Sequence, residues 1–60
     1  PRILIADDDT MVRIGLKTVI NWEENGFVLV GEAANGLEAM QLVQEKKPDI
    51  VITDIKMPVG

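Results

Sequence analysis

The stretch Ile3–Asp9 reads ILIADDD, and the stretch Ile50–Asp54 reads IVITD. Each is a short apolar run, rich in β-branched residues, that ends in aspartate. Such runs are typical of strands that are buried on both faces. If the two runs are parallel strands of one sheet, their carboxyl ends lie at the same edge. Four carboxylates then stand at that edge, and at least three of them could converge: Asp7, Asp8, Asp9 and Asp54.

A carboxylate cluster of this kind repels itself unless protons or a cation lie between the groups. The sequence contains no cysteine and no histidine, so the ligands of such a cation would be hard oxygen atoms. This ligand set favours Mg²⁺ over zinc. The same composition excludes disulfides, His-based catalysis and most zinc sites.

The chain has 60 residues and a net charge of −4. A folded chain of this length is one small domain at most, and it buries about 60% of the surface that its unfolded form exposes. The Lys and Arg residues are scattered, whereas nucleic-acid binding needs a basic patch. No apolar run approaches the ~20 residues of a membrane span, and no signal-peptide pattern is present. We therefore expect a soluble, cytoplasmic chain whose residues contact neither nucleic acid nor membrane.

Segments with helical periodicity alternate with the short apolar runs. We expect strands over Ile3–Ala6, Phe27–Gly31 and Asp49–Thr53, and helices over Met11–Glu24 and Leu37–Lys47. The order β-α-β-α-β implies an α/β fold with a parallel sheet and right-handed crossovers. Ligands of such sheets bind beyond the carboxyl ends of the strands, which is the edge that carries the acids.

The expected helices also have recognisable ends. Asp9 or Thr10 can cap the first helix, and Gly26 is expected to end it in a left-handed conformation. Asn35, with Glu38 three residues later, resembles a capping box for the second helix.

Helical spacing predicts which side chains face the sheet. The inward positions would be Val12, Leu16, Val19 and Ile20 in the first helix, and Ala39, Met40, Leu42 and Val43 in the second. The outward positions of the first helix would include Arg13 and Lys17. Trp22 is expected to be a packing residue.

Four motifs at fixed separations resemble a known family. They are the ILIADDD start, ANGLEA over Ala34–Ala39, KPD over Lys47–Asp49, and TDIKMP over Thr53–Pro58. Together they resemble the receiver domain of two-component response regulators, almost from end to end. An acid pair alone is a weak signal, but the pair together with the Asn-Gly turn and Asp-x-x-Met-Pro is a strong one. The resemblance implies the N-terminal βαβαβ half of a flavodoxin-like, doubly wound parallel sheet, with strand order 2-1-3 for the part present.

The resemblance also implies roles for individual residues. Asp54 would be the phosphoacceptor, and thus the catalytic residue, as well as a Mg²⁺ ligand. Asp8 would bind Mg²⁺ directly, Asp7 would act through a bound water, and Lys56 would contribute its backbone carbonyl. Asp9 would be a helix cap and not a ligand.

A receiver is a signalling switch and not an enzyme of ordinary turnover. The resemblance implies phosphoryl transfer from a sensor histidine kinase to Asp54, with Mg²⁺ as cofactor. The phrases in Val12–Leu16, Asn21–Glu24 and Gly31–Ala33 also resemble receivers joined to AraC-type DNA-binding domains. The parent protein is therefore expected to control transcription.

Residues 1–60 resemble a partial receiver, with strands 1–3 and helices 1–2. The remaining two strand-helix units, with a Ser or Thr after strand 4 and a Lys after strand 5, are absent. The strand Asp49–Thr53 would then be an open apolar edge, and such edges recruit other chains. We expect a dimer, a swapped assembly through this edge, or a remnant of a longer protein.

Two other functions compete with the receiver interpretation. A haloacid-dehalogenase-like phosphatase also has a strand ending in Asp, a second Asp two residues later and a Thr two further. Asp7 and Asp9 match the two aspartates of this pattern. Met11 stands where the pattern has Thr, and Thr10 lies one position too early. An inert pseudo-receiver, used for protein contacts only, would not need to retain the acids, and Mg²⁺ binding would distinguish it.

Overall fold

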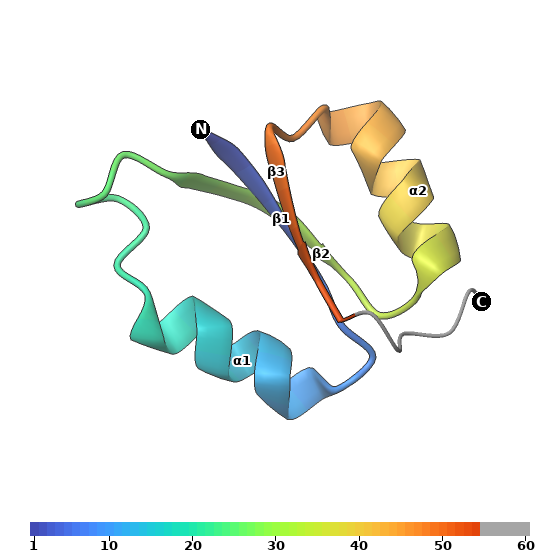
Figure 1. Ribbon diagram of the computed structural model, residues 1–60, viewed down its shortest axis with the longest axis horizontal. Coiled ribbons are helices and arrows are strands. Elements are labelled where there is room, and N and C mark those ends of the chain that lie inside the picture. Colours follow the sequence, from blue (N-terminus) through green and yellow to red (C-terminus); the bar gives the residue numbers. More distant parts are fainter. Residues whose placement is uncertain (55–60) are drawn as a thin grey trace.

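The computed structural model describes residues 1–54. Five elements alternate along the chain: β1 (Arg2–Ala6), α1 (Thr10–Val19), β2 (Val28–Ala33), α2 (Gly36–Lys46) and β3 (Ile50–Thr53). The strands form one parallel sheet in the order β2-β1-β3. The helices α1 and α2 lie on opposite faces of this sheet (Figure 1). The predicted α/β fold and the strand order 2-1-3 are therefore confirmed, and no helix within residues 1–54 is long and apolar enough to cross a membrane.

The central strand β1 supplies most of the core. Ile3, Leu4, Ile5 and Ala6 are buried, and Ala33 at the end of β2 joins them. Burial of a large aliphatic side chain contributes about 1.5–3 kcal/mol, so β1 is the main apolar anchor of the sheet. The strand β3 pairs with β1 on its other side, and its residues Ile50 and Val51 stay exposed. Among residues 1–54, β3 and β2 are the two edge strands of the sheet.

The strand β2 contains an irregularity opposite β1. Ile3 pairs with Leu29, but the next residue, Leu4, pairs with Gly31, so Val30 is an extra residue in β2. Because side chains alternate between the two faces of a sheet, one extra residue exchanges the faces for everything that follows. The strand continues to Ala33, so the predicted end at Gly31 was wrong.

This exchange of faces decides what lies on each side of β2. Gly31 faces α2, where a Cβ atom would lie 3.4 Å from Leu4 Cδ1 and 3.7 Å from Leu42 Cδ1. Leu42 can thus pack closely on the sheet. The next residue, Glu32, pairs with Ile5 and faces α1, whose side chains it contacts.

The helix α1 ends at Val19, so the predicted end at Glu24 was wrong. Ile20 is the C-terminal cap and is extended, with φ −89° and ψ 128°. Asn21 then starts a separate turn, because its Oδ1 accepts a hydrogen bond from the Glu24 N–H at 3.3 Å. Asparagine side chains compete in this way with the helical hydrogen bonds of the backbone.

Gly26 ends this separate turn with φ +75°. Its N–H donates to the Glu23 carbonyl at 3.0 Å, and the Phe27 N–H donates to the Trp22 carbonyl at 2.8 Å. This pair of bonds is the Schellman motif, so the left-handed Gly26 is confirmed although the helix it was expected to end stops earlier. Trp22 packs edge-on against Phe27 at 6.3 Å between ring centroids, as expected of a packing residue.

Helical spacing predicted the buried faces only in part. Val19 is 83% exposed, and Val12, Met40 and Val43 are exposed as well. The side chain of Arg13, predicted to face outward, is only 12% exposed. The reason is electrostatic: Glu32 and the Asp7 carbonyl hold the guanidinium against the end of the sheet.

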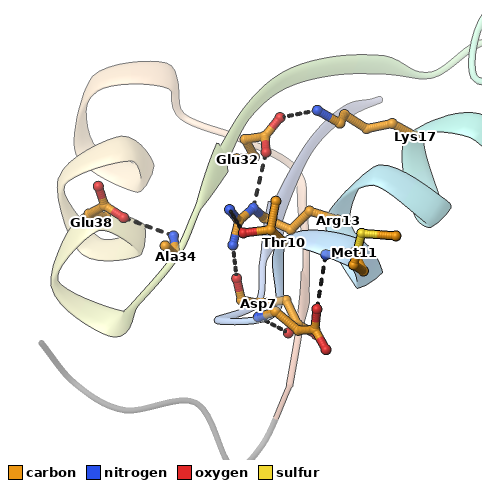
Figure 2. Close-up of polar contacts among 9 residues, drawn as sticks. Asp7, Thr10, Met11, Arg13, Lys17, Glu32, Ala34 and Glu38 are labelled. Atoms are coloured by element: carbon orange, nitrogen blue, oxygen red, sulfur yellow. Dashed lines mark hydrogen bonds and ion pairs between the residues drawn. The ribbon is translucent and has the colours of Figure 1, made fainter.

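The cap of α2 matches the prediction with one difference. Asn35 Oδ1 accepts a hydrogen bond from the Glu38 N–H at 2.9 Å. The Glu38 carboxylate accepts from the Ala34 N–H at 2.8 Å, where a standard capping box would use the Asn35 N–H. The two bonds still satisfy two backbone donors at the start of the helix, and Figure 2 shows the one between Ala34 and Glu38.

The central position of Leu4 predicts a large loss of stability on truncation. Leu4→Ala should lower the free energy of unfolding by about 2–5 kcal/mol, because it leaves a cavity between the sheet and α2. Gln41→Ala, at an exposed position of α2, should change it by less than about 0.5 kcal/mol. Urea denaturation of the purified full-length protein measures both values. Equal small losses would show that β1 is not the anchor of this sheet.

Candidate functional site

Three of the four predicted carboxylates converge at the carboxyl edge of the sheet. Asp7, Asp8 and Asp54 each offer one oxygen atom, and these atoms all lie within 4.8 Å of one another. The strand register explains the meeting, because Ala6 pairs with Thr53 and the next residue of each strand is an aspartate. Asp7 is half-buried, whereas Asp8 and Asp54 are exposed, so the cluster is open to a ligand from solvent.

Backbone hydrogen bonds hold two of these aspartates just beyond the strands. The Asp7 N–H donates to the Ala33 carbonyl of β2 at 3.0 Å, and the Asp54 N–H donates to the Ala6 carbonyl of β1 at 3.2 Å. The sheet pairing thus continues for one residue past β1 and β3. Both residues are thus tied to the sheet, although 47 sequence positions separate Asp7 from Asp54.

Side-chain hydrogen bonds set the course of the chain from β1 to α1. Asp7 Oδ1 accepts a hydrogen bond from the Asp9 N–H at 2.9 Å. Asp9 Oδ1 accepts one from the Met11 N–H at 2.9 Å, which makes Asp9 the N-cap of α1. The prediction that Asp9 is a helix cap is confirmed. The phosphatase alternative needs Asp9 in the site, and its use as a cap disfavours that function.

The three carboxylates fit a divalent cation that prefers oxygen ligands. Two ligand oxygens on opposite sides of a Mg²⁺ ion lie about 4.2 Å apart, because each Mg–O distance is about 2.1 Å. The upper limit of 4.8 Å between the aspartate oxygens is close to that span. A small inward movement would let three carboxylate oxygens bind one ion, and water molecules would fill the remaining positions of its octahedral shell. The predicted ligand Lys56 lies outside the described residues.

A second polar cluster, which sequence reasoning missed, lies beside the acids. Glu32 Oε1 accepts from Arg13 Nε at 3.0 Å, and Glu32 Oε2 accepts from Lys17 Nζ at 2.6 Å. Figure 2 shows the Arg13 guanidinium between Glu32 and the Asp7 carbonyl. The spacing of Arg13 and Lys17 placed them on one helical face, but only the irregularity in β2 turns Glu32 toward them.

The charges of this cluster perturb the acid at its centre. The hydrogen bond from Lys17 holds the pKa of Glu32 below its ordinary value of 4.5, and the bond from Arg13 acts in the same direction. Partial burial of the carboxyl opposes both effects. The ionised form of Glu32 is therefore favoured by folding.

The sequence matches a known protein family over nearly its whole length. The family model of the response regulator receiver domain matches residues 3–60. The transcriptional regulatory protein YesN of Bacillus subtilis, described as uncharacterized, is 47% identical over 57 residues. The transcriptional regulatory protein HptR of Staphylococcus aureus is 42% identical over 57 residues. Both alignments cover 95% of this chain but only 16% and 23% of these relatives, so the chain spans less than a quarter of their length.

A solved structure has the same architecture. The response regulator domain of Thermotoga maritima CheB superimposes with a TM-score of 0.83 and is 40% identical. The match covers 95% of this chain and 42% of that one. This likeness confirms the predicted flavodoxin-like fold class.

The lowered pKa of Glu32 predicts a pH-dependent contribution to stability. Because the unfolded chain protonates Glu32 first as the pH falls, the contribution is complete only well above the ordinary pKa of 4.5 and is lost as the pH falls through the lowered pKa. Glu32→Gln should reduce the free energy of unfolding by about 0.2–1 kcal/mol at neutral pH, a small value because the side chains are solvated. Urea denaturation of the wild type and the variant at about pH 7 and about pH 3.5 measures this difference.

The difference should shrink at the lower pH. Glu45→Gln, at an exposed position of α2, serves as the control and should show no such trend. A difference between wild type and Glu32→Gln that stays constant over this pH range would contradict the assignment of the ion pairs.

Proposed function

We propose that this chain, which belongs to the response regulator receiver domains of two-component systems, accepts a phosphoryl group on Asp54 with Mg²⁺ as cofactor. The observation that carries the proposal is the convergence of Asp7, Asp8 and Asp54 within 4.8 Å. In this interpretation Asp54 is the catalytic residue of a signalling domain. The domain promotes its own phosphorylation and does not turn over a metabolite.

The proposed reaction is a displacement at phosphorus. A carboxylate oxygen of Asp54 attacks the phosphorus atom, and the bond between phosphorus and the donor group breaks. The leaving group, an imidazole of a kinase or the acetate of acetyl phosphate, takes the electron pair, and Asp54 becomes an acyl phosphate. Mg²⁺ bound at this edge would neutralise the charge on the phosphoryl oxygens.

The residues of the chain would divide the task of holding that ion. Asp8 and Asp54 are the proposed direct ligands, together with the backbone carbonyl of Lys56. Asp7 is proposed to act through a water molecule, which is consistent with its Oδ1 already accepting from the Asp9 N–H. The position of Asp54 directly after β3 and the bond from its N–H to the Ala6 carbonyl keep the nucleophile beside β1.

The partners of the domain follow from the family. We propose a sensor histidine kinase as phosphoryl donor, a cytoplasmic location, and an output in transcription, as the names of YesN and HptR suggest. An AraC-type DNA-binding domain is the proposed output module. We further propose that residues 1–60 are the first half of the receiver, so that the β3 edge pairs with a further strand of the same protein or with a second copy.

Phosphorylation in vitro tests the proposed function. After incubation of the purified full-length protein with acetyl phosphate and Mg²⁺, intact-mass spectrometry should detect a gain of one phosphoryl group. Asp54→Ala should abolish the gain, because it removes the nucleophile. Chelation of Mg²⁺ should do the same. Asp8→Asn should raise the half-saturating Mg²⁺ concentration by at least about tenfold.

Asp9→Asn is the matched control. Asparagine caps helices as well as aspartate does, so this variant keeps the cap and should be phosphorylated like the wild type. No phosphoryl gain by the wild-type protein would favour an inert pseudo-receiver. Turnover of a generic phosphate ester would instead favour the phosphatase.

A further inference from the structure

Arg13 lies in the first turns of α1, yet its side chain is only 12% exposed. An arginine is rarely covered to this extent unless its donors are paired. Its guanidinium presents N–H donors in a rigid, planar fork, which suits it to hold several acceptors in fixed relative positions. The identity of those acceptors therefore indicates what the residue holds together.

The guanidinium bonds to three separate parts of the fold (Figure 2). Its Nε donates to Glu32 Oε1 of β2 at 3.0 Å, and its Nη2 donates to Thr10 Oγ1 of α1 at 3.2 Å. Its Nη1 donates to the backbone carbonyl of Asp7. That carbonyl belongs to the peptide group that joins Asp7 to Asp8, so the bond restricts rotation of the segment between the two acids.

Glu32 and Lys17 complete the arrangement. Glu32 reaches Arg13 because the extra residue in β2 turns it to the α1 face. One oxygen of its carboxylate accepts from Arg13 and the other from Lys17. The lowered pKa of Glu32 is consistent with a carboxylate held in its charged form by both cations. Lys17 bonds to Glu32, and no bond from it to Asp7 appears among residues 1–54.

We infer that Arg13 is a positioning residue for the acidic cluster: oriented by Glu32, it holds the Asp7–Asp8 peptide group so that both carboxylates meet Asp54 around a divalent cation. The inference rests on the proposed Mg²⁺-dependent function. It adds a residue that touches neither the cation nor the phosphoryl group. Its effect is exerted through the Asp7 carbonyl.

Charge and position predict opposite effects for the removal of Arg13. A cation beside three carboxylates repels Mg²⁺, so loss of its charge alone would strengthen Mg²⁺ binding. Loss of the hydrogen bond to Asp7 would instead weaken binding, because the ligands are no longer held in place. Stronger Mg²⁺ binding after removal of Arg13 would therefore indicate an effect of its charge alone, and weaker binding would indicate that Arg13 positions the ligands.

The experiment is a Mg²⁺ titration of the full-length protein, followed by the amide NMR signals of Asp8 and Asp54. Arg13→Gln should weaken Mg²⁺ binding by about tenfold and shift the Asp8 amide signal in the ion-free protein. Arg13→Lys keeps the charge but not the fork, so it should weaken binding to a similar extent. Glu32→Gln should have a smaller effect in the same direction.

Lys17→Gln is the matched control, because it removes one positive charge from the same cluster without a bond to Asp7. It should leave Mg²⁺ affinity within about twofold or raise it slightly. If folded Arg13→Gln and Arg13→Lys proteins bind Mg²⁺ as tightly as the wild type, or more tightly, Arg13 is not a positioning residue. If the wild type itself fails to bind Mg²⁺, the proposed function is wrong, and the cation-positioning role of Arg13 is wrong with it.

Discussion

The pairing of β1 with β2 on one side and β3 on the other is the constraint on which the rest of this structure depends. All three strands are parallel, so their carboxyl ends meet at one edge. The register that pairs Ala6 with Thr53 places Asp7 beside Asp54. A shift of that register by one residue would turn the apolar side chains of β3 to the wrong face and separate the acids. Packing and site geometry are therefore set by the same hydrogen bonds.

The second strand contributes to the site in a less direct way. Its extra residue lets Gly31 lie under Leu42 on the α2 side while Glu32 faces α1. Glu32 then binds Arg13, and Arg13 reaches the peptide group between the two acids at the end of β1. A local irregularity in β2 is thus connected to the candidate cation site through one ion pair and one hydrogen bond. The helix α1 takes part through the polar contacts of Arg13 and Lys17.

Much of the architecture could be predicted from the sequence because its strongest signals are local. The apolar runs that end in Asp7 and Asp54 predicted the strands, and Asn35 predicted the start of α2. The resemblance carried by TDIKMP and ANGLEA predicted the family and the strand order. These signals depend on residue type and spacing, which a sequence displays directly.

The remaining features depend on competing contacts within the folded chain, which the spacing of residue types along the sequence does not reveal. The helix α1 stops at Val19 because the side chain of Asn21 caps a new turn, although the apolar pattern continues beyond it. Arg13 turns inward because Glu32 is on its face, and that depends on one unpaired residue in β2. Helical periodicity treats every charged residue as solvated, so it placed Arg13 outside.

The most direct test of the account is to locate the phosphoryl group by chemical trapping. An acyl phosphate on aspartate is reduced by borohydride to homoserine, which peptide mapping by mass spectrometry assigns to one residue. After reaction with acetyl phosphate and Mg²⁺, the account predicts homoserine at position 54 and nowhere else in the acidic cluster. Homoserine at Asp7 or Asp8, or none in a protein that binds Mg²⁺, would contradict the claim that the β1–β3 register builds a phosphoryl-accepting site around Asp54.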